Sequence, residues 1–161
     1  MNRFISVIFL FLVSIIFLIL QTTLLSPRKL GVFSPDLNLI LIVFLALFFE
    51  VKVGAIIALG SAYVTDVLSG YLIGIHTLSR FAVFTVLKGF SENLYAQSKF
   101  TQAMALFLST VFSWFFVWVV LKMRTDVGFG ITPGLVMAQG LVNTVLGLPV
   151  FWLIGKANAR V

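Results

Sequence analysis

Residues 35–70 read PDLNLILIVFLALFFEVKVGAIIALGSAYVTDVLSG, two apolar runs separated by a turn that holds Glu50 and Lys52. The first run, 37–49, is short for a bilayer crossing, which takes about 20 residues. The second run starts near residue 53, is rich in glycine and alanine, and ends close to Asp66. Two such runs joined by one short charged turn predict a pair of packed helices in a membrane.

The composition of the whole chain supports this reading. Of its 161 residues, 61% are apolar and 10% are charged, and the mean hydropathy is +1.16. An ordinary soluble domain has roughly 45–50% apolar and about 25% charged residues. The chain therefore does not fit a soluble domain, a disordered chain or a disulfide-stapled module. We expect an all-α integral membrane protein.

Six apolar runs divide the chain. They predict a compact bundle of six transmembrane helices in a single transmembrane domain, residues 1–161. Five crossings are the alternative, if the second and third runs form a shallow hairpin. The first run is too long for the apolar part of a signal peptide and is read as an uncleaved helix. The expected helices cover residues 4–25, 35–50, 53–69, 75–90, 100–121 and 132–155.

The charges are consistent with this topology. Eleven basic and five acidic residues give a net charge of +6. They flank the apolar runs, so we interpret them as anchors at lipid headgroups rather than as a nucleic-acid site. Six crossings place both termini on one side, and a small excess of basic residues there favours the cytoplasm.

Two runs begin with a hydroxyl residue and a proline. The first opening is Ser34, Pro35 and Asp36, and the second is Thr132 with Pro133. A hydroxyl can cap a helix, proline fits its first turn, and an acid suits the positive end of the helix dipole. We expect Pro35 and Asp36 to lie inside the second helix, close to the membrane interface.

Asp66 is the residue in these runs that most needs an explanation. A charged side chain inside a bilayer is costly and usually faces the bundle or a cavity. Gly54, Ala58, Ala62 and Asp66 are spaced by four and share one helix face, which predicts close helix packing. We favour a structural hydrogen-bonding role, in which Asp66 caps the 69–74 turn or pairs with His76 or Arg80. A proton or ion pathway and a partner contact are the alternatives.

The last helix carries a second polar face. Gln139, Asn143 and Gly147 are spaced by four. Amides can hydrogen-bond between helices in a membrane. The face is interpreted as helix packing, with a wall that contacts a ligand or partner as the alternative.

Catalytic patterns are missing from the sequence. There is no cysteine, and His76 is the single histidine. No G-x-S-x-G nucleophile motif and no phosphate-binding P-loop occurs. We therefore expect neither an enzyme nor a metal or organic cofactor.

The order of motifs between residues 35 and 80 resembles the rod shape-determining protein MreD family. The resemblance rests on P-D-L at the start of the second helix and on D-x-x-x-G-x-x-x-G after the small-residue helix. Length and helix count are similar over the whole chain. The family-like positions in this sequence are Pro35, Asp36, Asp66, Gly70 and Gly74.

This resemblance implies a non-catalytic scaffold of the bacterial cell-elongation machinery in the inner membrane. It implies binding to the single-pass protein MreC and a link from MreB filaments to RodA and its transpeptidase, and so to peptidoglycan synthesis and rod shape. A partner helix would dock on the face of the third or sixth helix. The family is similar in architecture to the substrate-binding subunits of energy-coupling-factor transporters. The competing hypothesis is therefore a vitamin-transporter subunit, with Asp66, His76, Gln139 and Asn143 as ligand anchors.

Overall fold

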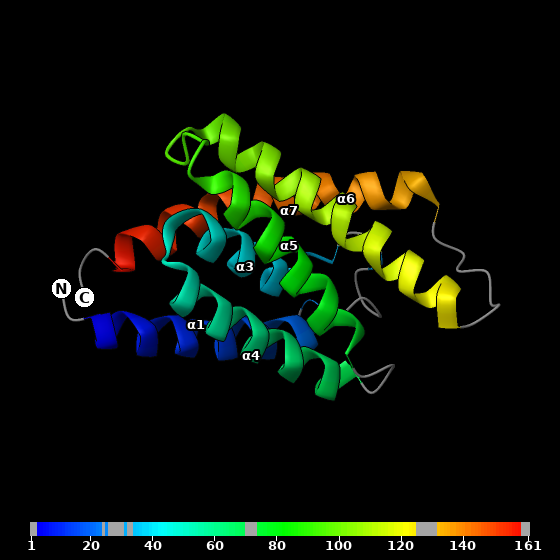
Figure 1. Cartoon of the computed structure of the whole chain (residues 1–161), viewed down its shortest axis with the longest axis horizontal. Helices are drawn as coiled ribbons and strands as arrows, with labels where there is room; N and C mark the ends of the chain where they lie inside the picture. Colours follow the sequence, from blue (N-terminus) through cyan, green and yellow to red (C-terminus); the bar gives the residue numbers. More distant parts are fainter. Residues whose placement is uncertain are drawn as a thin grey trace.

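The computed structural model describes residues 3–23, 25, 31, 34–69, 74–124 and 132–158. Over these residues the chain is all-helical, with six α-helices, so the all-α class and the six helices are confirmed for this part of the chain, while the number of bilayer crossings stays a prediction. The helices, labelled as in Figure 1, are α1 (Arg3–Thr23), α3 (Leu37–Phe48), α4 (Val51–Ser69), α5 (Ile75–Ser91), α6 (Lys99–Arg124) and α7 (Pro133–Asn158).

The expectation that Pro35 and Asp36 lie inside the second helix is wrong. Pro35 and Asp36 precede α3, and Asp36 is its N-cap, with its side chain accepting a hydrogen bond from the Leu39 N–H. The carboxylate competes better for this position than the Ser34 hydroxyl, which donates to the Leu25 carbonyl instead. By contrast, α7 begins at Pro133, in the first-turn position where proline fits.

Helix α3 forms the centre of the molecule. It contacts α1, α4, α5, α6 and α7, and all its residues from Leu37 to Leu47 are buried. A helix that is apolar on every side is stable only when it is surrounded. Its 12 residues rise about 18 Å, which is short of a hydrocarbon core of about 30 Å. Helix α3 therefore cannot cross the core by itself.

The other helices enclose α3 in two groups. Figure 1 shows α1 and α4 on one flank, α6 and α7 on the other, and α3 and α5 between them. The beginning of α1 and the end of α7 lie at the same end of the bundle. This arrangement agrees with an even number of passes.

The outer helices have the length and surface that a membrane requires. Val51–Leu68, Lys99–Met123 and Pro133–Ala157 are long and apolar enough to cross a bilayer, and Val7–Thr23 and Leu37–Phe48 are shorter apolar helices. Large apolar side chains point outward, among them Ile56 and Val145 at 71% and 68% exposed. Such a surface is suited to lipid, which is consistent with a helical membrane protein. The assignment of residues 1–161 to one transmembrane domain stays a prediction.

Candidate functional site

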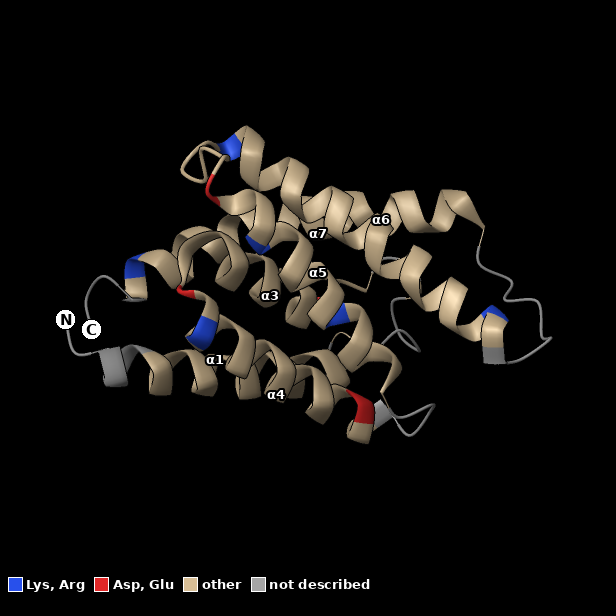
Figure 2. Cartoon of the chain, viewed as in Figure 1, with Lys and Arg blue, Asp and Glu red and all other residues tan. Residues whose placement is uncertain are grey.

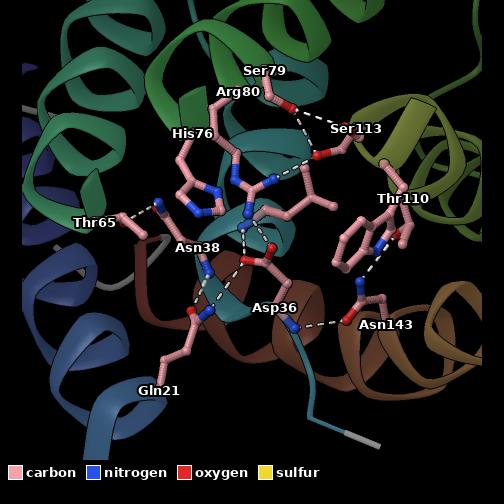
Figure 3. A network of polar contacts seen from close by, with 12 residues as sticks. Gln21, Asp36, Asn38, Thr65, His76, Ser79, Arg80, Thr110, Ser113 and Asn143 are labelled. Atoms are coloured by element: carbon pink, nitrogen blue, oxygen red, sulfur yellow. Dashed lines mark hydrogen bonds and ion pairs between the residues drawn. The ribbon is translucent and has the colours of Figure 1, made fainter. Parts of the chain in front are cut away.

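Side chains from other helices accept hydrogen bonds from the backbone N–H groups at the start of α3 (Figure 3). The Asp36 carboxylate accepts from the Leu39 N–H at 2.9 Å. The Asp36 N–H donates to Asn143 Oδ1 at 2.8 Å, and the Asn38 N–H donates to Gln21 Oε1 at 3.3 Å. Backbone groups in hydrocarbon have no water to bond with. A helix that starts inside the bundle therefore needs these partners from the protein.

The depth of this site follows from its neighbours. Asn143 lies near the middle of the 26-residue helix α7 and donates to Thr110 Oγ1 at 3.0 Å. Thr110 lies near the middle of α6, which is also 26 residues long. The midpoint of such a helix is about 20 Å from either end. If α6 and α7 cross the membrane, the start of α3 lies within the hydrocarbon core.

A buried ion pair occupies the same place. The Arg80 guanidinium pairs with the Asp36 carboxylate and donates to Ser113 Oγ at 2.7 Å. Arg80 is 4% exposed, and the Asp36 side chain is 14% exposed. Inside a membrane a lone charge is expensive, so each of these residues depends on the other. The pair joins α5 to the start of α3.

Further bonds extend this site to every described helix. Asn38 Nδ2 donates to Thr65 Oγ1 at 2.9 Å, which ties α3 to α4. The Ser79 and Ser113 hydroxyls lie 2.9 Å apart, which ties α5 to α6. We call the whole set the polar network. It comprises Gln21 of α1, Asp36 before α3, Asn38 of α3, Thr65 of α4, Ser79 and Arg80 of α5, Thr110 and Ser113 of α6, and Asn143 of α7.

Gln139 lies one helical turn from Asn143 and makes its own contacts. Its Oε1 accepts from Trp114 Nε1 at 2.5 Å, and its Nε2 donates to the Ser34 carbonyl at 3.2 Å. The polar face of α7 therefore bonds to α6 and to the segment before α3. This is the helix-packing role expected for that face.

Asp66 forms a separate site at the start of α5. Its side chain is fully buried and accepts from the backbone N–H groups of Gly74, His76 and Thr77 at 3.0, 2.9 and 2.8 Å. The Thr77 hydroxyl also donates to it, at 2.5 Å. Asp66 therefore caps α5 from the preceding helix, through the backbone of His76, while Arg80 pairs with Asp36. Among the expected alternatives, these contacts are those of a structural cap.

Gly74 has a conformational role beside this cap. Its φ of +99° lies in the left-handed region, which L side chains rarely adopt. The chain can thus turn into α5 with the Gly74 N–H directed at Asp66. Gly70, the other glycine of the motif, lies outside the described residues.

The small residues of α4 face the interior of this chain. Gly54, Ala58 and Ala62 are buried on the same side as Asp66. A Cβ built on Gly54 would lie 2.8 Å from the Phe84 ring of α5. The stripe thus permits close packing of α4 on α5, and it is already covered within the chain. A partner helix would need a different face of α4.

Helix α7 packs on α6 in a similar way. A Cβ on Gly140 would lie 2.9 Å from the Phe107 ring, and one on Gly147 would lie 2.6 Å from Leu106 Cδ1. Asn143, between them on the helix, is fully buried. The buried side of α7 is therefore engaged with α6 and α3.

The structure brings together only some of the predicted site residues. Asp36 and Asn143 meet in the polar network, Gln139 adjoins it, and buried Pro35 leads into it. Sequence reasoning did not include Gln21, Asn38 or Ser113, and left the partner of Arg80 open. A usable signal existed, since Asn38 is an isolated polar residue in an apolar run and Arg80 is a charged residue within the fourth helix. A role for any of these residues in binding a partner stays a prediction.

The chemistry of the site is structural. Among the described residues, no group of three or more histidine, aspartate or glutamate side chains could hold a metal ion. The buried carboxylates already accept bonds from cations or helix N–H groups. The charged and amide side chains of the site hold the helices in fixed positions relative to one another.

Comparison with known proteins finds a family model that matches almost the whole chain. A family model described as the rod shape-determining protein MreD matches residues 1–157 of the 161. Searches of curated proteins and of solved structures each return no match.

Proposed function

The chain belongs to the rod shape-determining protein MreD family, and from this premise we propose that it is a non-catalytic membrane scaffold of the cell-elongation machinery. Membership in the family assigns it to rod-shape determination and to a family of structural proteins. The proposal adds that it binds MreC and helps couple MreB filaments to RodA and its transpeptidase. In this account the folded bundle presents an outer surface on which a single-pass partner helix docks.

The observation that carries this proposal is the polar network. Side chains from all six described helices bond to one another around Asp36 and Arg80. Hydrogen bonds and ion pairs within a buried network favour one arrangement of helices, although Asn38 Oδ1 and Arg80 Nε have no partner among the described residues. The large outward side chains are apolar, as on α4 and α7. A rigid interior with an apolar exterior suits a platform for lateral helix contacts, which depend on close packing in lipid.

The distribution of lysines supports an inner-membrane orientation with cytoplasmic termini. Figure 2 shows most of the basic residues that the structure describes toward the end of the bundle where α1 begins and α7 ends. Cytoplasmic segments of membrane proteins carry an excess of lysine and arginine. The lysines at this end are Lys52 at the start of α4, Lys88 near the end of α5, Lys99 at the start of α6 and Lys156 near the end of α7.

A test of the scaffold proposal combines co-purification with cell shape. The tagged chain is extracted from membranes of its native host, and bound proteins are identified by mass spectrometry. We expect MreC among them, and we expect rod cells depleted of the chain to become round. Rod shape kept after depletion, with no single-pass partner recovered, would overturn the proposal. Val145→Leu, a conservative change of an outward-facing side chain, serves as the control and should retain the partner.

The hydrogen bonds of the expected ligand anchors support the vitamin-transporter alternative less well than the scaffold. Three of its four expected anchors, Asp66, Gln139 and Asn143, already bond within the chain. A ligand would have to displace those bonds. Thermal unfolding of the purified protein against a panel of vitamins separates the two readings. The scaffold predicts no specific increase in Tm, whereas a large increase with one vitamin would favour transport.

A further inference from the structure

A pocket of about 370 Å³ lies between the end of α3, the start of α6 and the end of α7. Its walls are mainly aromatic, and it opens outward past Phe48 and Trp152, which are 39% and 56% exposed. Such walls offer an apolar surface against which an acyl chain can pack. The residues that matter here are Phe44, Phe48, Lys99, Gln102, Phe151 and Trp152.

One side of this pocket is positively charged. Lys99 is the first residue of α6, and the first turn of that helix contains no acid. Helix N-termini carry unpaired N–H groups and a partial positive charge, so a lysine there is unfavourable unless an anion is near. Lys156 does not line the pocket, but its Nζ lies 4.8 Å from the centre of the Trp152 ring, which does. The Gln102 side chain is fixed in the wall because its Nε2 donates to the Ala96 carbonyl.

Two other pockets show that this charge is not a general feature of the surface. One, of about 400 Å³ between α5 and α6, includes Phe90 and Phe100. Another, of about 280 Å³ between α6 and α7, includes Trp114 and Trp118. Neither of these two is lined by a charged residue. Both suit acyl chains of any lipid, whereas the first combines an apolar wall with a cation.

We propose that the α3–α6–α7 pocket binds an anionic phospholipid. The phosphate lies at Lys99 and the start of α6, and one acyl chain packs against Phe44, Phe48 and Phe151. The aromatic wall selects a lipid over a soluble phosphate, and the cationic rim selects an anionic headgroup over a zwitterionic one. The pocket is at the lysine-rich end of the bundle, and anionic lipids attract such residues at the cytoplasmic leaflet. The proposal does not depend on the scaffold function.

Tryptophan fluorescence can test the site because the chain has three tryptophans. Trp152 lines the pocket, and a Trp114→Phe/Trp118→Phe variant leaves it as the single reporter. The protein is reconstituted with brominated phosphatidylglycerol or brominated phosphatidylcholine, and quenching gives the relative association of each lipid. We expect about fivefold preference for phosphatidylglycerol, the factor equivalent to about 1 kcal/mol per lysine near an anionic surface. Lys99→Glu should abolish the preference.

Lys122→Glu is the matched control. Lys122 also lies over a tryptophan, Trp118, at 5.0 Å, but at the opposite end of α6. Its substitution should leave the Trp152 signal unchanged. Equal quenching by both lipids, or an unchanged preference in Lys99→Glu, would overturn the proposal. Displacement of the lipid by millimolar inorganic phosphate would also overturn it, because it would indicate a soluble-anion site.

Native mass spectrometry provides a second readout that keeps all three tryptophans. Protein released from mixed micelles should retain phosphatidylglycerol, and Lys99→Glu should retain several-fold less of it than Lys122→Glu. Equal retention by the two variants would contradict the proposed site. Lys99 is exposed, so its substitution leaves the packed interior intact.

Discussion

Two acids, the fully buried Asp66 and the partly buried Asp36, each cap the start of a helix. Asp36 caps α3 from the segment just before it, and Asp66 caps α5 from the preceding helix α4. A carboxylate near a helix N-terminus interacts favourably with the helix dipole and with unpaired N–H groups. In hydrocarbon those N–H groups cannot turn to water. The two acids are thus placed where an ionised side chain has the most to bond with.

The Asp66 cap leads to the first prediction. Asp66→Ala leaves the N–H groups of His76 and Thr77 without their acceptor and should lower the free energy of unfolding by about 1–2 kcal/mol. Thr77→Val removes one bond to Asp66 and should cost about 1 kcal/mol. Unfolding in bicelles, followed by circular dichroism, measures both.

Thr85→Val is the matched control on the same helix. The Thr85 hydroxyl donates to the Phe81 carbonyl, one turn back on α5, and is exposed. Its loss should change stability by less than about 0.5 kcal/mol. If Thr77→Val is as mild as Thr85→Val, and Asp66→Ala is mild too, the cap does not stabilise α5.

At the scale of elements, close packing of α4 on α5 is the feature most sensitive to volume. Gly54→Ala places a Cβ 2.8 Å from the buried Phe84 ring, so the ring must move. Gly60→Ala, on the same helix, meets nothing within 4 Å. Alanine is favoured over glycine in a helix by about 1 kcal/mol. We therefore expect Gly60→Ala to be neutral or stabilising and Gly54→Ala to be destabilising, as measured by unfolding.

Larger changes on the same stripe should have larger effects. Ala58→Leu and Ala62→Leu each add a bulky side chain at a fully buried position. Overpacking of this kind typically costs about 1–3 kcal/mol, and we expect less folded protein in the membrane. Normal amounts of both variants, measured by size-exclusion profile after extraction, would show that the stripe tolerates added volume.

The elements themselves could be predicted from the sequence, whereas their contacts could not. Hydropathy places a helix in each apolar run because each run must avoid water. It does not tell which acid Arg80 meets, since Asp36 is 44 positions away in the chain and Asp66 is nearer. That choice depends on α3 starting deep in the bundle. The predicted start of this helix is two residues too early because Ser34 and Asp36 both make reasonable caps.

The sequence pattern also could not predict that α3 lies at the centre of the bundle. Its run looks like a short crossing, and the Leu- and Ile-rich segment 37–47 is equally consistent with lipid contact on one side. In the structure all of these residues are buried by five neighbouring helices. Only the tertiary arrangement distinguishes a central helix from a peripheral one when both are apolar throughout.

At the scale of the whole molecule, buried polar residues lie within an apolar core, and many large apolar side chains face outward. Asn38, Arg80 and Asn143 are at most 4% exposed, whereas Ile56 on α4 is 71% exposed. This distribution makes the interior the source of specificity and leaves the exterior for lipid and partner helices. We expect outward changes to alter partner or lipid binding without unfolding the protein. Changes in the polar network should reduce folded protein and partner recovery together.

The central claim is that the Asp36–Arg80 pair holds the bundle together from within the membrane. A double-mutant cycle in bicelles tests it with Asp36→Asn, Arg80→Gln and the double variant. Asparagine can still cap α3, so the cycle isolates the charges. Each single change leaves one buried charge unpaired and should lower the free energy of unfolding by about 3–5 kcal/mol. The double variant should lose less than the sum, with a coupling of at least about 1 kcal/mol; strictly additive losses, or single losses below about 0.5 kcal/mol, would contradict the claim.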